Sequence, residues 1–161
     1  MKAAIVLLVS FELSTGLLGQ NRQLVKSADG KLQAVVKPAR NRNVDENRVS
    51  IFDSNGKCLR THNFSSPDGE HGYGADGAQW TPDSQFFVFR MRSSGGHSPM
   101  YAPLVFWSRS TNRFYQVNNY TADQTFSVGA PDEVSVSTWP DMKPVTLNLG
   151  GLAKSELNEL R

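Results

Sequence analysis

The sequence is poor in the residues that build covalent or metal-held frameworks. It contains one cysteine and three histidines in 161 residues, so no internal disulfide can form, and no pair of cysteines or histidines has the spacing of a zinc site. Its longest uninterrupted apolar run, Ala3–Val9, has seven residues, whereas a membrane-spanning helix needs about 20. We therefore expect no disulfide scaffold, no bound metal and no other cofactor.

The sequence also has no block of charge of one sign. Seventeen Lys and Arg residues are balanced by fifteen Asp and Glu residues, for a net charge of +2. Without a basic stripe to contact phosphates, a nucleic acid is not an expected partner. The densest group of arginines, Arg40–Arg48, also contains Asp45 and Glu46, and this mixture predicts a solvated loop between strands.

The remaining composition indicates one ordinary folded domain. Hydrophobic residues make up 39% and aromatic residues 10% of the chain, which argues against a disordered, collagen-like or coiled-coil protein. A domain of about 150 residues buries enough surface to be stable without covalent staples.

The N-terminus has the features of an export signal. Met1–Lys2 is a short positive region, and the apolar run Ala3–Val9 is followed by a second run, Leu13–Leu18. The small residues Ser14, Gly16 and Gly19 offer cleavage points. We expect residues 1–19 to be a signal peptide, the mature chain to be periplasmic or secreted, and no membrane insertion after cleavage. Glu12 inside the apolar region opposes this interpretation. The alternative is a buried first strand or helix.

The rest of the chain consists of short β-rich segments separated by turn residues, and we predict a single all-β domain over residues 20–152 with a tail at 153–161. The strongest hairpin signal is Asn55-Gly56, a pair typical of a type I′ turn. Gly72–Gly77 reads as a glycine-rich loop, and Ser155–Leu160 predicts one or two helical turns. The predicted strands are Leu32–Val36, Arg48–Phe52, Phe86–Phe89, Leu104–Trp107, Phe114–Val117, Val134–Val136 and Val145–Leu149.

A Pro-Asp or Ala-Asp turn recurs before several of these strands. Its aspartates are Asp29, Asp83 and Asp132, at intervals of 54 (83 − 29) and 49 (132 − 83) residues. Repeats of 40 to 55 residues built only of strands are typical of propeller blades. We therefore expect about 2.5 repeats of antiparallel, blade-like hairpins, which form a twisted sheet, a sandwich or an incomplete propeller. About 142 residues of mature chain hold too few repeats for the roughly four blades that a closed propeller needs.

The segment Trp80–Phe89, with its Trp-Thr-Pro-Asp-Ser turn, resembles the repeats of TolB-type β-propellers, and Ser27–Val36 is a weaker copy. The resemblance covers roughly residues 24–64 and 78–118. The third copy lacks the tryptophan, and Ser84 stands where the repeat has glycine. The resemblance implies a blade-like architecture and a role as a platform for protein interactions, although some relatives are enzymes or accessory domains of enzymes. We expect Trp80, Trp107 and Trp139 to belong to the core.

The loop over residues 93–101 is the most conspicuous candidate site. Its two glycines allow close approach of the backbone to a ligand, and binding residues are commonly carried on loops. The stretch Ser93–Pro99 also resembles small exported bacterial proteins, a likeness that implies no activity. The candidate contact residues, including two from the neighbouring glycine-rich segment, are Ser94, Gly95, Gly96, His97, Tyr101, His71 and Tyr73.

No complete catalytic motif accompanies these residues. The Gly-x-Ser-x-Gly elbow of serine hydrolases and the phosphate-binding loop are both absent from the sequence. We therefore expect a small exported, non-enzymatic module that binds a protein or a small ligand. Two alternatives stay open: a hydrolase that uses His97 with Glu70 or Asp76, and a structural domain that forms homo-oligomers through edge strands.

Overall fold

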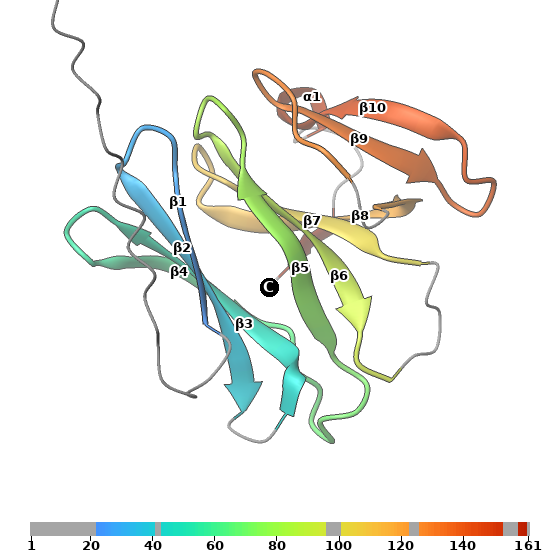
Figure 1. The fold of residues 1–161 in the computed structure, drawn as a ribbon, viewed down its shortest axis with the longest axis horizontal. Helices are drawn as coiled ribbons and strands as arrows, with labels where there is room; N and C mark the ends of the chain where they lie inside the picture. The colour runs from blue at the N-terminus through green and yellow to red at the C-terminus, as the bar shows by residue number, and fades with distance from the viewer. Residues whose placement is uncertain (1–21, 41–42, 96–100, 123–125, 153–157, 161) are drawn as a thin grey trace, which may run out of the picture.

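The computed structural model describes residues 22–40, 43–95, 101–122, 126–152 and 158–160. These residues form two antiparallel β-sheets and one short helix (Figure 1). The predicted all-β fold of antiparallel hairpins is therefore confirmed.

The first sheet is a four-stranded meander in which each strand pairs with the next along the chain. Its strands are β1 (Gln23–Lys26), β2 (Leu32–Arg40), β3 (Asn43–Asp53) and β4 (Cys58–Asn63). Two strands are longer than their apolar runs predicted. Pro38 does not end β2, because the pairing with β3 continues past it through an irregularity between Pro38 and Arg40. On the other side of the turn, β3 begins at Asn43 and takes in the acidic stretch that was expected to be a loop.

The second sheet begins as a similar meander and then curls (Figure 1). It holds β5 (Tyr73–Trp80), β6 (Phe86–Ser93), β7 (Pro103–Ser108), β8 (Arg113–Thr121), β9 (Glu133–Thr138), β10 (Pro144–Asn148) and β11 (Asn158–Leu160). The outer side of β8 is shared, since β11 pairs with Phe114–Gln116 and β9 pairs with Tyr120 and Thr121.

The second sheet is covered on both faces. One face packs against the first sheet through a cluster that contains Ile51, Phe89 and Trp107, and the rings of Trp80 and Trp107 meet edge to face at 5.9 Å. The other face packs against the β9–β10 hairpin through a second cluster, which contains Phe106. Trp80 and Trp107 thus lie in the core as predicted, whereas Trp139 is 39% exposed.

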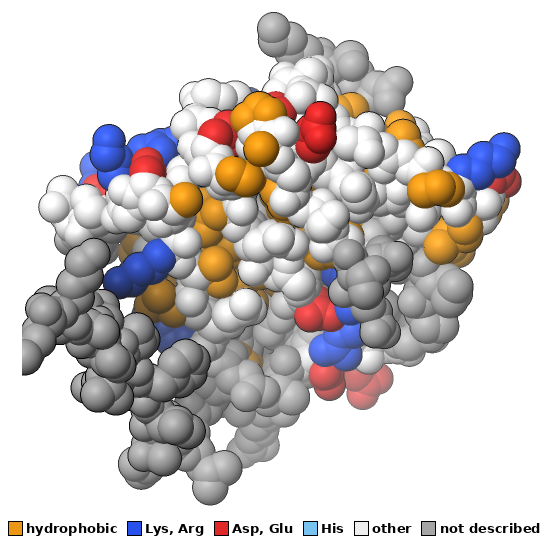
Figure 2. Space-filling view, turned by 45° about the horizontal axis from the view of Figure 1, so that its top comes forward, with side chains coloured by type: hydrophobic (Ala, Val, Ile, Leu, Met, Phe, Trp, Pro, Cys, Tyr) orange, Lys and Arg blue, Asp and Glu red, His pale blue; other side chains and the backbone are white. Residues whose placement is uncertain are grey.

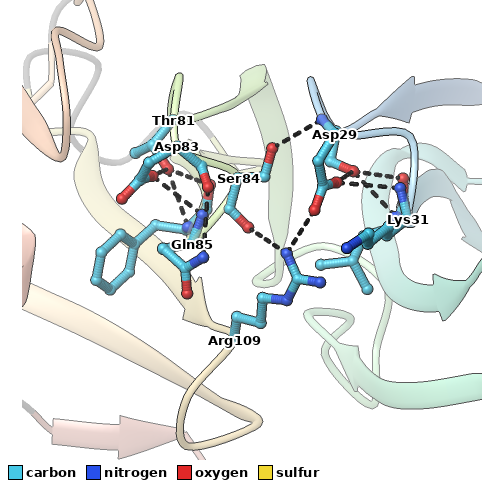
Figure 3. A network of polar contacts seen from close by, with 10 residues as sticks. Asp29, Lys31, Thr81, Asp83, Ser84, Gln85 and Arg109 are labelled. Carbon is cyan, nitrogen blue, oxygen red and sulfur yellow. Dashed lines mark hydrogen bonds and ion pairs between the residues drawn. The ribbon is translucent and has the colours of Figure 1, made fainter.

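The turns before β2 and β6 have the same hydrogen bonds, and they lie side by side (Figure 3). In each turn a hydroxyl donates to the aspartate two residues on: Ser27 Oγ to Asp29 at 2.7 Å, and Thr81 Oγ1 to Asp83 at 2.6 Å. The same hydroxyl accepts the N–H of the first strand residue, and each aspartate accepts the N–H two residues after it. The fourth residue has positive φ in both turns, 68° at Gly30 and 60° at Ser84.

The two turns are also bonded to each other. The N–H of Asp29 donates to Ser84 Oγ at 3.1 Å. Arg109, in the β7–β8 hairpin, donates to Asp29 Oδ2 at 2.8 Å and to the Ser84 carbonyl at 3.5 Å (Figure 3). The hydrogen bond from the Ser27 hydroxyl, those from Arg109 and the Lys31 N–H, and the charge of Arg109 hold the pKa of Asp29 well below its usual range. The repeated turns therefore join the two sheets at this end of the molecule.

The third copy of the turn uses its aspartate differently. Asp132 accepts Asn148 Nδ2 at 2.6 Å and the N–H of Gly150 at 2.9 Å. It therefore fastens the start of α1 (Leu149–Leu152) to the start of β9. The short helical turn predicted near the C-terminus is present, but it is formed by Leu149–Leu152. Asn158–Leu160, which was assigned to the helix, forms strand β11. Among the described residues no helix is long and apolar enough to cross a membrane.

Two further local predictions were wrong. The Asn55-Gly56 turn is not type I′, because only Gly56 has positive φ, 80°. Asp53 accepts the N–H groups of Asn55 and Lys57, both at 2.9 Å, and so stabilises a different turn. Residues 73–77, expected to be a loop, begin strand β5, which pairs with β6 despite its glycines. That pairing has an irregularity between Asp76 and Gln79, and Gly77 there has a φ of 64°.

We expect Ser84→Ala and Ser84→Gly to differ in stability. Both remove the hydroxyl that accepts the Asp29 N–H, a loss of about 1 kcal/mol. Glycine also relieves the left-handed backbone conformation, which costs a residue with a side chain about 1–2 kcal/mol. Urea denaturation should therefore show Ser84→Ala to be less stable than the parent, and Ser84→Gly to be close to it. Equal losses for the two variants would contradict this account of the turn.

Candidate functional site

The described candidate residues gather at the end of the molecule opposite the repeated turns. His71 and Tyr73 lie where the β4–β5 loop enters β5, Ser94 and Gly95 follow β6, and Tyr101 precedes β7. Tyr73 pairs with Ser93 across the sheet, so the two segments that we expected to be neighbours are adjacent. Gly96 and His97 lie outside the described residues.

Ser94 is held by a buried carboxylate that sequence reasoning missed. Glu46, on β3, is 0% exposed. Its oxygens accept Ser66 Oγ at 2.7 Å, the Ser66 N–H at 3.2 Å, the Gly72 N–H at 2.7 Å and Ser94 Oγ at 3.1 Å. Ser94 also donates its N–H and its hydroxyl to the Gly72 carbonyl, both at 3.0 Å. We call this arrangement the Glu46 clamp. It joins the first sheet, the β4–β5 loop and the end of β6.

The clamp corrects the expectation that Glu46 belongs to a solvated loop. Burial alone would raise the pKa of Glu46, but the hydrogen bonds from Ser66, Gly72 and Ser94 outweigh burial and lower it. Glu46 therefore stays ionised and accepts the hydrogen bonds of the clamp. Gly72 allows this approach, since a Cβ there would lie 2.4 Å from the Glu46 carboxylate and 2.7 Å from the Phe64 carbonyl.

His71 lies in a turn of the same kind as those before β2 and β6. Ser66 Oγ lies 2.7 Å from Asp68 Oδ1 and the same distance from Glu46, so that its one proton is shared between the two carboxylates, and the N–H of Glu70 donates to the same oxygen of Asp68 at 2.9 Å. The His71 ring contacts the other oxygen of Asp68 at 2.5 Å. This hydrogen bond and the charge of Asp68 raise the pKa of His71.

A cavity of about 240 Å³ opens beside this turn. His71 and Tyr73 line its rim, and Phe64, Met91 and Leu160 are among its apolar lining residues. His62 also lines it and packs against Phe64 with ring centroids 4.5 Å apart. Burial and the charge of Arg60 lower the pKa of His62. The cavity thus has one histidine that favours the charged form and one that favours the neutral form.

Exposed aromatic side chains continue from this cavity across the same end of the molecule. The rings of Tyr101 and Trp139 lie 5.1 Å apart, and Tyr101 Oη donates to the Asn118 carbonyl at 2.8 Å. Burial raises the pKa of Tyr101, and the nearby phenol of Tyr73 raises it further. Tyr73 is 38% exposed. We call Tyr73, Tyr101, Trp139 and Met142 the aromatic face.

Met142 and Trp139 are both in the β9–β10 hairpin turn, which projects at the right of Figure 1. Met142 is 38% exposed and has a φ of 55°, a conformation that costs a bulky side chain about 1 kcal/mol or more. Figure 2 shows apolar side chains at its right-hand edge, next to a few charged ones, and others across its upper middle, with charges of both signs scattered between them. The exposed position of Trp139 was not predicted, because a tryptophan at a strand end is more often a core residue.

Only some of the residues that a hydrolase or a metal site would use lie in the described part of the chain. Asp76 forms an ion pair with Arg90, which occupies its carboxylate, and the expected partner of Asp76, His97, is not described. In the described part of the chain no group of three or more His, Cys, Asp or Glu side chains is placed to hold a metal ion.

No protein-family model and no curated protein sequence matches the chain. The assignment of function therefore depends on the geometry of the site.

We expect the Glu46 clamp to be essential for stability. Glu46→Gln should lose about 2–3 kcal/mol in free energy of unfolding at pH 7, because an amide nitrogen would face backbone and hydroxyl donors. Since the folded-state pKa of Glu46 is lowered, its contribution is present at neutral pH and is lost as the pH falls below about 4.5. Urea denaturation at pH 7 and pH 3.5 measures both effects. The difference between parent and variant should shrink at the lower pH, and an undiminished difference would contradict an ionised Glu46.

The two histidines of the cavity should titrate in opposite directions from the ordinary value of 6.5. We expect NMR titration to show the pKa of His71 above 6.5 and that of His62 below it. Asp68→Asn should bring the pKa of His71 back toward its usual range and leave His62 unchanged, which makes His62 the internal control. A His71 pKa that does not respond to Asp68→Asn would show that the observed contact is not formed in solution.

Proposed function

We propose that this protein is a small exported binding module that contacts a protein partner through the aromatic face. The observation that carries the proposal is the concentration of exposed apolar side chains. Four large hydrophobic side chains are exposed among the described residues, and three of them, Tyr73, Trp139 and Met142, belong to this face. The fourth, Leu24, lies on β1 in the other sheet.

The chemistry of these side chains favours a protein as the ligand. Aromatic residues and methionine are enriched in protein interfaces, and Trp and Tyr are the residues most often found to dominate binding energy. The aromatic face has a polar border, because Asn118 and Asn119 are exposed on β8 and the Tyr101 hydroxyl donates to the Asn118 carbonyl. A cluster of exposed apolar groups rimmed by polar ones is typical of a partner-binding surface.

The polar groups at this end support binding over catalysis. Ser94 is engaged in the Glu46 clamp, His71 is bonded to Asp68, and Asp76 is paired with Arg90. Each of these contacts is accounted for by the fold. The hydrolase alternative depends on His97 and has no observation in its favour.

The export and the relation to TolB-type repeats remain part of the proposal. The apolar N-terminus supports export. The shared turn before β2 and β6 and the two successive four-stranded meanders support a blade-like repeat. Both fit a role as an interaction platform outside the cytoplasm.

The proposal is tested by site-specific photo-crosslinking in the cells that produce the protein. A benzophenone amino acid placed at Trp139 should give a discrete crosslinked partner, and the same group at Leu24, which is more exposed than Trp139, should not. With the captured partner purified, Trp139→Ala and Tyr101→Ala should each weaken binding by about 30-fold, the equivalent of about 2 kcal/mol at an interface centre.

Leu24→Ala is the matched control and should bind like the parent. Circular dichroism and thermal melting of each variant establish that the fold is kept. Equal crosslinking from positions 24 and 139, or unchanged affinity of both aromatic variants, would overturn the assignment of this face.

A further inference from the structure

The outermost strands of the two sheets differ in how their free edges are protected. An exposed edge offers unpaired N–H and C=O groups to any other strand. In the described part of the chain, β4 and β5 each form a hydrogen bond with another part of the fold: the Leu59 carbonyl accepts Asn112 Nδ2 at 3.1 Å, and the Ala75 N–H donates to Asn47 Oδ1 at 2.8 Å. Strand β1 carries an exposed charged residue, Lys26, of the kind that natural edge strands use against pairing.

Strand β10 is different, since it carries no charge and, apart from the Asn148 carbonyl at the start of α1, no hydrogen bond from the described residues reaches its outer edge. The register with β9 shows which groups point outward. Thr138 donates its N–H to the Lys143 carbonyl at one end, and Leu149 donates to the Asp132 carbonyl at the other. Because hydrogen-bonded pairs alternate along an antiparallel ladder and the register is continuous, Val145 and Leu147 bond to β9. The backbone groups of Pro144, Thr146 and Asn148 therefore face outward.

These outward groups are complementary to themselves. When two β10 strands are placed antiparallel with Thr146 opposite Thr146, each Thr146 N–H meets the Thr146 carbonyl of the other strand. Each Asn148 N–H then donates to the Pro144 carbonyl of the other strand. Pro144 acts only as an acceptor in this pair, so its lack of an N–H does not prevent the bond. The remaining outward carbonyl on each side, that of Asn148, begins α1 (Leu149–Leu152) and accepts the first hydrogen bond of that helix. A two-fold axis through Thr146 thus satisfies every outward N–H group of the strand.

We propose that two copies of this chain pair through β10 about such an axis and extend the seven-stranded sheet across the dimer. The side chains favour a second copy over an unrelated strand. Residues 144–148 carry no charge, so like strands do not repel each other, and the charged residues that natural edge strands use against pairing are absent from this strand. Val145 and Leu147 both contact the second core cluster, and in the dimer Val145 lies beside Leu147 of the second copy, which continues that apolar face.

The pairing is short, and this sets its strength. Five residues from each copy bury less area than a standard interface, so we expect a dissociation constant in the micromolar range. The dimer is isologous and closes on itself, so that further copies do not add.

Sedimentation velocity of the purified protein over about a hundredfold range of concentration tests the proposal. The parent should shift reversibly from monomer to dimer. Thr146→Lys should weaken dimerisation at least about tenfold by placing two like charges at the axis, and Thr146→Pro should do the same by removing the central N–H. Ser135→Lys is the matched control, because Ser135 is exposed and pairs with Thr146 from within the sheet on β9. It should dimerise like the parent.

Amide exchange measured by NMR identifies the edge independently of the variants. In the dimer the N–H groups of Thr146 and Asn148 should become protected as concentration rises, whereas those of Val145 and Leu147 should be protected at every concentration. A monomer at all concentrations, a dimer in which Thr146 still exchanges fast, or protection of Thr146 that does not depend on concentration would each overturn the proposal. Because neither readout involves the aromatic face, failure here leaves the proposed partner-binding function untouched.

Discussion

All six side chains of β7, Pro103–Ser108, are buried, so this strand needs an apolar layer on each of its faces. The side chains that point to one face pack against the first sheet, and those that point to the other pack against the β9–β10 hairpin. Neither layer could be removed without exposing aromatic residues such as Trp107 or Phe106, which are 1% and 0% exposed. The order of the strands, the curl of the second sheet and the position of β9 and β10 all satisfy this requirement.

Much of this arrangement could be predicted from the sequence because burial leaves a simple pattern. The continuous apolar run Phe86–Phe89 and the alternation in Val134–Val136 were both predicted to be strands. The structure explains the two patterns, since β6 is buried over Phe86–Phe89 and β9 is buried at alternate positions. The turn before β6 was predicted because Pro82 and Asp83 are typical turn residues. The errors arose where one side chain changed the local outcome. At Asn55-Gly56, hydrogen bonds to Asp53 stabilise a turn of a different type. The glycines after Gly72 favoured a loop, but pairing with β6 stabilises a strand there.

The candidate site was less predictable, since it depends on contacts between distant segments. Loop composition correctly indicated that the segments of Tyr73 and Ser94 are neighbours, because adjacent antiparallel strands bring their ends together. Nothing local distinguished Glu46 from an exposed charge in a polar stretch, and its burial results from donors 20 to 48 residues away along the chain. Trp139 shows the reverse error, since it was predicted to be buried and is exposed. It follows an alternating strand whose inward positions end at Thr138, so its ring lies on Tyr101 at the surface.

The two ends of the molecule therefore have different physical characters. At one end the connections are short, each aspartate is bonded within its turn or to the next element, and Arg109 joins turns that are 80 residues apart. At the other end the β4–β5 and β6–β7 connections are longer, and the Glu46 clamp holds only their bases. Rigid strands that carry longer loops are the usual setting for binding residues, because the loops can vary without loss of the core. The Glu46 clamp fixes where β5 begins and where β6 ends. It therefore sets the position of the Tyr73 backbone, while the Tyr73 ring lies outside the core.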